Sequence, residues 1–143
     1  MTAVLRSATR ADIPGMHRVR MSVRENQLIS IRLTDADYID AIESRGRGWV
    51  VELDGAIVAF AVGITTDASI WALFVEPGYE GRGFGRRLHD EMVNWLWRQG
   101  HDGLWLTTDP GTRAQHFYEA AGWKVVGPGS HGEVRMELSG PPA

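Results

Sequence analysis

The sequence predicts a mixed α/β (α+β) fold, with a mostly antiparallel sheet of six to seven strands flanked by about four helices. Short apolar segments of strand length alternate with amphipathic segments of helical length. Asp54-Gly55 joins two of the apolar segments in the manner of a tight hairpin. A glycine-rich loop joins the apolar segment 70–75 directly to the longest amphipathic segment, 84–99. The helix after the fourth strand therefore predicts a crossover within an initially antiparallel sheet.

The length of 143 residues suits one domain with a real core. Apolar residues make up 43% and charged residues 23%, which is ordinary for a globular chain. We find no repeat, linker or low-complexity run. The sequence predicts a single domain over residues 2–138 and a flexible tail over 139–143, because the tail is rich in glycine and proline.

The first half of the chain predicts two helices between a short strand and a three-stranded meander. Asp12 is expected to cap the first helix, with Pro14 in its first turn. Thr34-Asp35-Ala36-Asp37 resembles a capping box that opens a second, short helix carrying Tyr38 and Ile42. The expected strands are residues 4–6, 49–53, 57–62 and 70–75.

The second half predicts two more helices and three more strands. The helix over 84–99 has an apolar stripe and can end at Gly100 in a left-handed cap. That stripe consists of Leu88, Met92, Trp95 and Leu96. A shorter helix over 112–121 is closed by Gly122. The remaining strands are expected at 104–107, 123–126 and 134–138.

The composition excludes several classes of site and partner. The chain has no cysteine, which excludes disulfides, zinc thiolates and cysteine nucleophiles, and its five histidines lack metal-ligand spacing. The net charge of −3 argues against nucleic acid and anionic membranes as partners. No apolar run approaches the ~20 residues of a membrane span, and the first residues do not resemble a signal peptide. We therefore expect a cytoplasmic protein without a metal.

The glycine-rich loop predicts an anion site at the start of the longest helix. Three glycines lie in it: Gly81, Gly83 and Gly85. Their N–H groups can converge on an anion at a helix N-terminus. Arg82, Arg86 and Arg87 crowd the first turn, where cations oppose the helix dipole by about 0.3–1 kcal/mol each. A bound polyanion would explain this arrangement better than solvated arginines in a flexible turn.

Two segments resemble motifs of the GNAT superfamily of N-acetyltransferases. Residues 80–85, Glu-Gly-Arg-Gly-Phe-Gly, are similar to its motif Gln/Arg-x-x-Gly-x-Gly/Ala. Residues 114–123 are similar to its Ala-x-x-Phe-Tyr-Glu-x-x-Gly-Phe stretch. Glu80 replaces the usual Gln or Arg, and Gly111 stands where the family often has Asn; Thr112 and Arg113 are the candidate replacements. The expected element order matches the family fold over almost the whole chain.

The resemblance implies acetyl-coenzyme A as co-substrate, bound between splayed fourth and fifth strands. Amides around four residues would hold its pyrophosphate: Arg82, Gly83, Gly85 and Arg86. Backbone groups of Leu73, Phe74 and Val75 would pair with the pantetheine arm, and the Glu80 side chain is expected to turn away from the phosphates.

The resemblance also implies two catalytic residues. Tyr118 would protonate the departing thiolate, although a core tyrosine bonded to the backbone is a fair competing interpretation. Some relatives have a glutamate base early in the fourth strand, where this chain has Ser69. Glu25 is the candidate general base, with a water chain as the alternative.

We therefore expect transfer of an acetyl group to a primary amine by direct attack in a ternary complex. The acceptor would be a small-molecule or peptide amine, and Trp71 and Trp105 could line its pocket. The sequence leaves the oligomeric state undecided, with a homodimer as one possibility. The first alternative is a module that senses acyl-coenzyme A without turnover. The second, a nucleic-acid-binding domain that uses the arginines, is disfavoured by the net charge.

Overall fold

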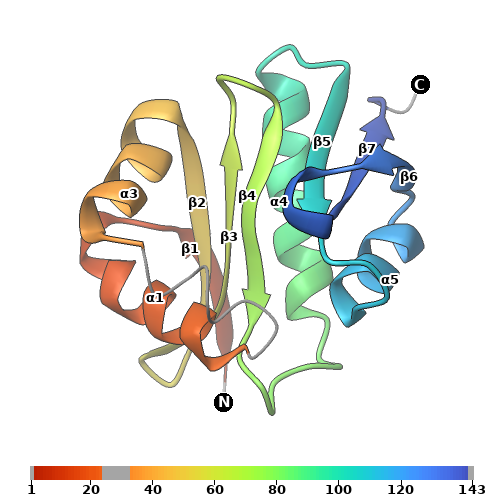
Figure 1. Cartoon of the computed structure of the whole chain (residues 1–143). Helices are drawn as coiled ribbons and strands as arrows, with labels where there is room; N and C mark the ends of the chain where they lie inside the picture. The colour runs from red at the N-terminus through yellow and green to blue at the C-terminus, as the bar shows by residue number, and fades with distance from the viewer. Residues whose placement is uncertain (1, 24–32, 142–143) are drawn as a thin grey trace.

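The computed structural model describes residues 2–23 and 33–141 and confirms the mixed α/β fold. Seven strands form one sheet in the order β1-β2-β3-β4-β5-β7-β6 (Figure 1). Among the strands that the structure describes, only β4 and β5 pair in parallel. The strands are β1 (Ala3–Ser7), β2 (Gly46–Leu53), β3 (Ala56–Ile64), β4 (Ser69–Val75), β5 (Gly103–Thr108), β6 (Lys124–Pro128) and β7 (Val134–Ser139).

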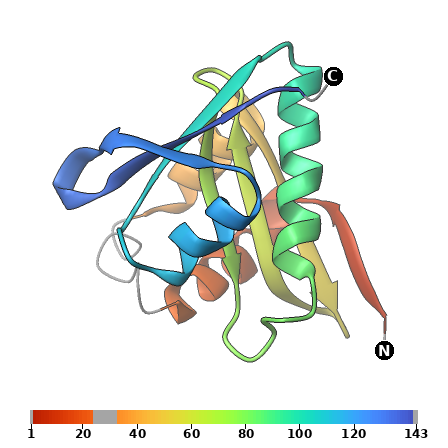
Figure 2. The same cartoon turned by 90° about the vertical axis from the view of Figure 1, so that its right-hand side faces the viewer.

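Helices cover both faces of the larger part of the sheet. They are α1 (Ile13–Ser22), α3 (Asp35–Ile39), α4 (Phe84–Arg98) and α5 (Arg113–Ala120). α3 continues as a π-helical segment over Asp40–Arg45. α1 and α3 lie on one face of β1 to β4 and α4 lies on the other, as Figures 1 and 2 show together. None of the helices in residues 2–23 and 33–141 has the length and apolarity that crossing a membrane requires.

Local turn and cap chemistry agrees with the sequence. Asp54 and Gly55 both adopt positive φ, 52° and 81°, as a tight hairpin of the mirror-image type needs. The capping box is present, since Asp37 N–H donates to Thr34 Oγ1 and Thr34 N–H donates to Asp37 Oδ2. Two glycines after helices adopt the expected left-handed φ: Gly100 (97°) and Gly122 (102°).

The prediction that Asp12 caps α1 with its side chain is wrong. The chain enters the helix one turn earlier, through a 3₁₀ turn over Arg10–Asp12 that follows Thr9. Asp12 Oδ2 accepts the Thr9 N–H at 2.8 Å, and both carboxylate oxygens accept from Arg6 on β1 at 2.8 and 2.9 Å. The Arg6 guanidinium therefore holds the pKa of Asp12 below its usual range. The Asp12 carboxylate therefore accepts from Thr9 and Arg6 instead of from the N–H groups of α1.

The sheet separates two apolar cores. The α4 side contains the predicted stripe residues Leu88, Met92 and Leu96, all fully buried. Trp95 lies at the edge of that stripe, partly buried and edge-on to Trp49 at a ring distance of 5.6 Å. The other side buries residues of α1, α3 and β3: Ile13, Met16, Val19, Tyr38 and Phe60.

β4 and β5 meet at one end and separate along the rest of their length. Their single register pair is Ser69 with Trp105. Directly beyond it β4 has a bulge, because Val62 pairs with Ala72 whereas Gly63 pairs with Ile70, which leaves Trp71 as an extra residue. Figure 2 shows that β5 diverges from β4 and that the two strands lie farthest apart at the end of β4 that leads into the glycine-rich loop. The predicted splay between the fourth and fifth strands is thus confirmed.

The C-terminal strand extends slightly past the predicted domain boundary at residue 138. β7 includes Ser139, and the Gly140 N–H donates to the Asp102 carbonyl at 3.3 Å. The first two residues of the expected tail are therefore bonded to the rest of the chain.

Candidate active site

A cleft of about 620 Å³ occupies the space that the diverging strands open. Its walls come from the end of α1, from β4, from the glycine-rich loop with the first turn of α4, and from α5. Most of the predicted site residues line it: Leu73, Phe74, Val75, Gly83, Gly85, Arg86 and Tyr118. Arg82 does not, and Glu25 lies outside the described residues. The two predicted motifs, which lie far apart in the sequence, therefore line one cavity.

The start of α4 presents backbone N–H groups that make no hydrogen bond to any described residue. The first hydrogen bond of the helix runs from Arg87 N–H to the Gly83 carbonyl at 3.0 Å. Within the described part of the chain, no group accepts from the N–H groups of residues 81–86. Gly83 sits before the helix with φ of 84°, and a Cβ built on it meets no atom within 4 Å. These features are those of an anion site at a helix N-terminus.

The three arginines of this region do not converge on the cleft. Arg86 lines it, while its Nε donates to Asp90 Oδ1 at 3.0 Å. Arg87 lines a separate surface groove beside β1. The Arg82 guanidinium lies over the Tyr79 ring, 5.1 Å from its centroid. The expectation that the three arginines gather around one anion is therefore not met, because the fold directs their side chains to different places.

The Glu80 carboxylate is bound within the loop and across the cleft. Its Oε1 accepts the Gly78 N–H at 2.6 Å, and its Oε2 accepts from Arg113 Nη1 at 2.9 Å. Hydrogen bonds from the N–H groups of Glu80 and Gly78, together with Arg113, lower the pKa of Glu80. Both Glu80 and Arg113 line the cleft.

The edge of β4 that faces the cleft has backbone groups that pair with none of the described strands. The Glu76 N–H donates to Val58 on β3 at 2.8 Å. Because N–H and C=O groups alternate in direction along a strand, Phe74 also directs its groups toward β3, whereas Leu73 and Val75 direct theirs toward β5. At the level of Leu73 and Val75, β5 is no longer paired with β4. Leu73 and Val75 therefore offer an open edge to an extended ligand.

Tyr118 places its hydroxyl at the cleft. The residue is 7% exposed, and its ring packs edge-on against Phe117 and Trp123 at 5.4 and 5.6 Å. The hydroxyl makes no hydrogen bond with any described residue, so the interpretation of a core tyrosine bonded to the backbone is not supported. Burial raises the pKa of the Tyr118 hydroxyl above its ordinary value. The group stays protonated at neutral pH.

His89 links α4 to the segment after α5. The Trp123 indole N–H donates to His89 Nε2 at 2.9 Å, so Nδ1 carries the imidazole proton and donates to Asp90 Oδ1, also at 2.9 Å. The ring lies against Phe117 and Tyr118. Burial lowers the pKa of His89, although Asp90 opposes this. The spacing of the histidines tests His89 only as a metal ligand. Its position next to Leu88 of the buried stripe is the signal that predicts a buried imidazole.

We expect the buried neutral His89 to make stability depend on pH. The unfolded chain takes up a proton near pH 6.5, while the folded chain resists it until a lower pH. The free energy of unfolding should therefore be highest above pH 6.5 and fall as the pH drops through the window between the two pKa values. Each unit between them contributes about 1.4 kcal/mol.

Chemical denaturation at pH 7 and pH 5 measures this effect. In His89→Gln the amide oxygen can still accept from Trp123, but the group no longer titrates. This variant should lose the His89 component of the difference between the two pH values. An unchanged difference would show that His89 is not responsible.

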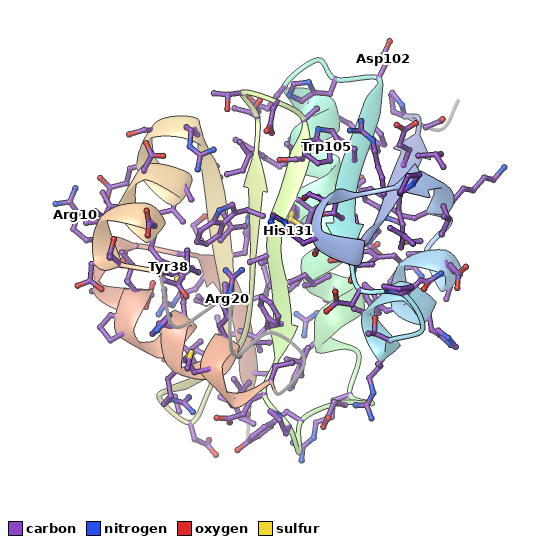
Figure 3. The ribbon with its side chains drawn as sticks, viewed as in Figure 1. Arg10, Arg20, Tyr38, Asp102, Trp105 and His131 are labelled. Atoms are coloured by element: carbon purple, nitrogen blue, oxygen red, sulfur yellow. The ribbon has the colours of Figure 1, made fainter. Side chains whose placement is uncertain are left out.

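A second group of aromatic and polar residues lies where β4 meets α1 and α3. Trp71 packs edge-on against Tyr38 at 5.2 Å, and the Arg20 guanidinium lies 4.9 Å from the Trp71 ring. Trp105 on β5 donates its indole N–H to the Asp67 carbonyl, and Arg135 covers its ring at 4.5 Å. Figure 3 shows Arg20, Tyr38 and Trp105 on the same side of the sheet.

No carboxylate stands at the position of Ser69, whose hydroxyl donates to Asp67 Oδ1 at 2.5 Å. Among residues 2–23 and 33–141, no three His, Asp or Glu side chains are grouped so that they could hold a metal ion. Tyr79, Ala114 and Phe117 also line the cleft and were not predicted, although each is a close neighbour of a predicted residue.

Known proteins resemble this chain in sequence and in fold. A relative from Haemophilus ducreyi, the [ribosomal protein bS18]-alanine N-acetyltransferase, is 30% identical over 73 residues. That match covers 49% of this chain and 50% of the relative, so it spans about half the relative's length.

Two solved structures share the fold at low identity. The ribosomal-protein-S18-alanine N-acetyltransferase from Escherichia coli has a TM-score of 0.77 at 19% identity, over 96% of this chain and 94% of that one. The PaiA N-acetyltransferase from Thermoplasma acidophilum, in complex with coenzyme A, has a TM-score of 0.80 at 15% identity, over 97% and 99%. A sequence model of the Acetyltransferase (GNAT) family matches residues 13–123, and the chain therefore belongs to the GNAT family of acetyltransferases.

Proposed function

We propose that the protein is an acetyl-coenzyme A-dependent N-acetyltransferase that acts on a primary amine in a ternary complex. One observation carries the proposal. One cleft contains N–H groups at the start of α4, an open edge of β4 and the Tyr118 hydroxyl. Neither those N–H groups nor that hydroxyl is bonded to a described residue. A long ligand with an anionic middle and a reactive end would engage all three. Acetyl-coenzyme A has that form, and the family uses it.

Two backbone surfaces would bind the co-substrate. The amides around Arg82, Gly83, Gly85 and Arg86 would hold the pyrophosphate, favoured by the positive end of the α4 dipole. The amide contacts need no Arg82 side chain in the cleft. Leu73 and Val75 would bond to the amides of the pantetheine arm as an added strand does, with Phe74 contributing to the wall.

In the reaction, the uncharged amine nitrogen attacks the thioester carbonyl carbon. A C–N bond forms, the C–S bond breaks, and the sulfur leaves as a thiolate that takes a proton. An N–H group of the open β4 edge would stabilise the oxyanion. Tyr118 would donate to the sulfur. Full transfer from an ordinary phenol near pKa 10 to a thiolate near 8.5 is uphill by about 2 kcal/mol. Burial raises the pKa of Tyr118 and makes the transfer more unfavourable still, so the proton moves late. Glu25, or a chain of water molecules, would accept the proton from the amine.

The acceptor side of the cleft favours an amine with an apolar or aromatic neighbour. Trp71 and Trp105, which are partly exposed, would supply aromatic surface to the acceptor, although neither lines the cleft of about 620 Å³ itself. The relative from Haemophilus ducreyi acts on an alanine of ribosomal protein bS18, which makes peptides with an N-terminal alanine a suitable acceptor to test first. A homodimer and a cytoplasmic location stay predictions.

Coenzyme A is expected to raise the melting temperature of the purified protein. Ligand at 100 times its Kd should add about 2.7 kcal/mol to the free energy of unfolding. Differential scanning fluorimetry with coenzyme A measures the shift. No shift at millimolar ligand would contradict the proposal.

Release of free thiol from acetyl-coenzyme A, across small amines and alanine peptides, then tests turnover. Binding without turnover on any amine would favour the sensor instead. The absence of a strand carboxylate at Ser69 motivates that alternative.

A further inference from the structure

The ion pair between Glu80 and Arg113 connects the glycine-rich loop with the first residue of α5. Arg113 Nη1 donates to Glu80 Oε2 at 2.9 Å, although 33 residues separate the two in the sequence. Both residues line the cleft. The side chains are 77% and 40% exposed, and an exposed ion pair of this kind contributes little to stability. A role in the fold therefore does not account for it.

The two partners differ in how firmly the protein holds them. The other oxygen of Glu80 accepts the Gly78 N–H at 2.6 Å, so the loop backbone fixes the carboxylate. Arg113 donates one N–H to Glu80, and no other described group accepts from its guanidinium. A guanidinium has five N–H donors in a planar fork. Arg113 can thus keep Glu80 and still donate to a second anion in the cleft.

Charge explains why a second anion would need Arg113. Glu80 precedes the six N–H groups of residues 81–86 that no described group accepts from. An unneutralised carboxylate at this place would repel a phosphate brought to those groups. Arg113 supplies positive charge directly beside Glu80 in the cleft. Arg86 also lines the cleft but is paired with Asp90, and Arg87 lines another groove.

We propose that Arg113 binds the pyrophosphate of the co-substrate while it remains paired with Glu80, and thereby neutralises the carboxylate that the loop holds beside the phosphates. This inference rests on the proposed use of coenzyme A. It assigns to one α5 side chain a contact that backbone amides alone cannot make. Bidentate donation by arginine to phosphate oxygens has the geometry for it.

Isothermal titration of the full chain with coenzyme A, dephospho-coenzyme A and pantetheine tests the proposal. Arg113→Gln should raise the Kd for coenzyme A by about 10-fold or more, because a hydrogen bond to a charged group is lost. Dephospho-coenzyme A keeps the pyrophosphate, so its Kd should rise equally. Pantetheine lacks the pyrophosphate and should show no such loss.

Two further variants isolate the role of the pair. Glu80→Gln added to Arg113→Gln should recover part of the lost affinity, since the unpaired carboxylate is gone. Arg87→Gln removes the same charge from the same region outside the cleft, and should leave the Kd within about 2-fold after screening by salt. The melting temperature of each variant without ligand checks that the fold is intact.

Each outcome separates the inference from the proposed function. A wild-type protein that does not bind coenzyme A overturns both. Normal wild-type binding with an unchanged Kd in Arg113→Gln overturns only the inference. A loss that is absent with dephospho-coenzyme A would place Arg113 at the 3′-phosphate and overturn the pyrophosphate assignment. No recovery in the double variant would overturn the neutralising role of Arg113.

Discussion

Replacing Tyr118 with phenylalanine is expected to lower kcat for acetyl transfer by about 10²- to 10⁴-fold, the range typical of a lost general acid. The Kd for coenzyme A should change little, because the ring remains and the backbone amides at the start of α4 are unaltered. Folding should also be unaffected, since the hydroxyl makes no hydrogen bond with any described residue. Steady-state thiol release and a coenzyme A titration measure both parts.

Tyr79→Phe is the matched control for this variant. Tyr79 also lines the cleft, but it belongs to the glycine-rich loop and lies beneath Arg82. It should retain kcat. Because burial raises the pKa of Tyr118, its titration should not limit the rate between pH 7 and 9. A Tyr118→Phe protein with wild-type kcat would remove Tyr118 from the mechanism.

Replacing Gly83 with leucine should abolish the stabilisation by coenzyme A, a loss of about 2.7 kcal/mol at a ligand concentration of 100 times the wild-type Kd. A side chain at Gly83 has open space around its Cβ, on the wall of the cleft where backbone N–H groups would meet the pyrophosphate. The positive φ of 84° adds a strain of about 1–2 kcal/mol in the absence of any ligand. Scanning fluorimetry with and without coenzyme A separates these two effects.

Gly100→Leu controls for the strain. Gly100 follows the other end of α4, has φ of 97°, and likewise has no atom within 4 Å of a built Cβ. Both variants should melt at lower temperatures than the wild type, but only Gly100→Leu should keep the shift with coenzyme A. If Gly83→Leu keeps it as well, the pyrophosphate does not sit against this backbone.

The sequence predicted the features that local chemistry decides. The Asp54-Gly55 hairpin and the Thr34 capping box each depend on residues within one turn, so no distant contact can displace them easily. The stripe of α4 was recognisable for a similar reason, because its spacing sets which side is buried. The glycine-rich loop and the Tyr118 segment were recognised by their motifs, and they do line one cleft.

The missed features depend on contacts between different elements or on the direction of a single side chain. Asp12 is bound by Arg6 of a strand, which no capping rule anticipates. The bulge at Trp71 arises from pairing with β3, and a run of apolar residues does not reveal an extra residue in it. His89 is buried by Trp123, 34 residues later. Arg82 was placed with the other loop residues because the direction of a side chain in a glycine-rich turn is not encoded in the motif.

Because β4 and β5 share a single register pair, the sheet is incomplete between them. At the level of Leu73 and Val75, the rungs that a neighbouring strand would supply are missing. If the thioester arm takes that place, the substrate becomes a temporary eighth strand, and the two halves of the sheet, otherwise paired at one end, are bridged at this level only while it is bound. Amide hydrogen exchange on this edge would then report occupancy, and the lifetime of the protein in a cell would follow the supply of its own substrate.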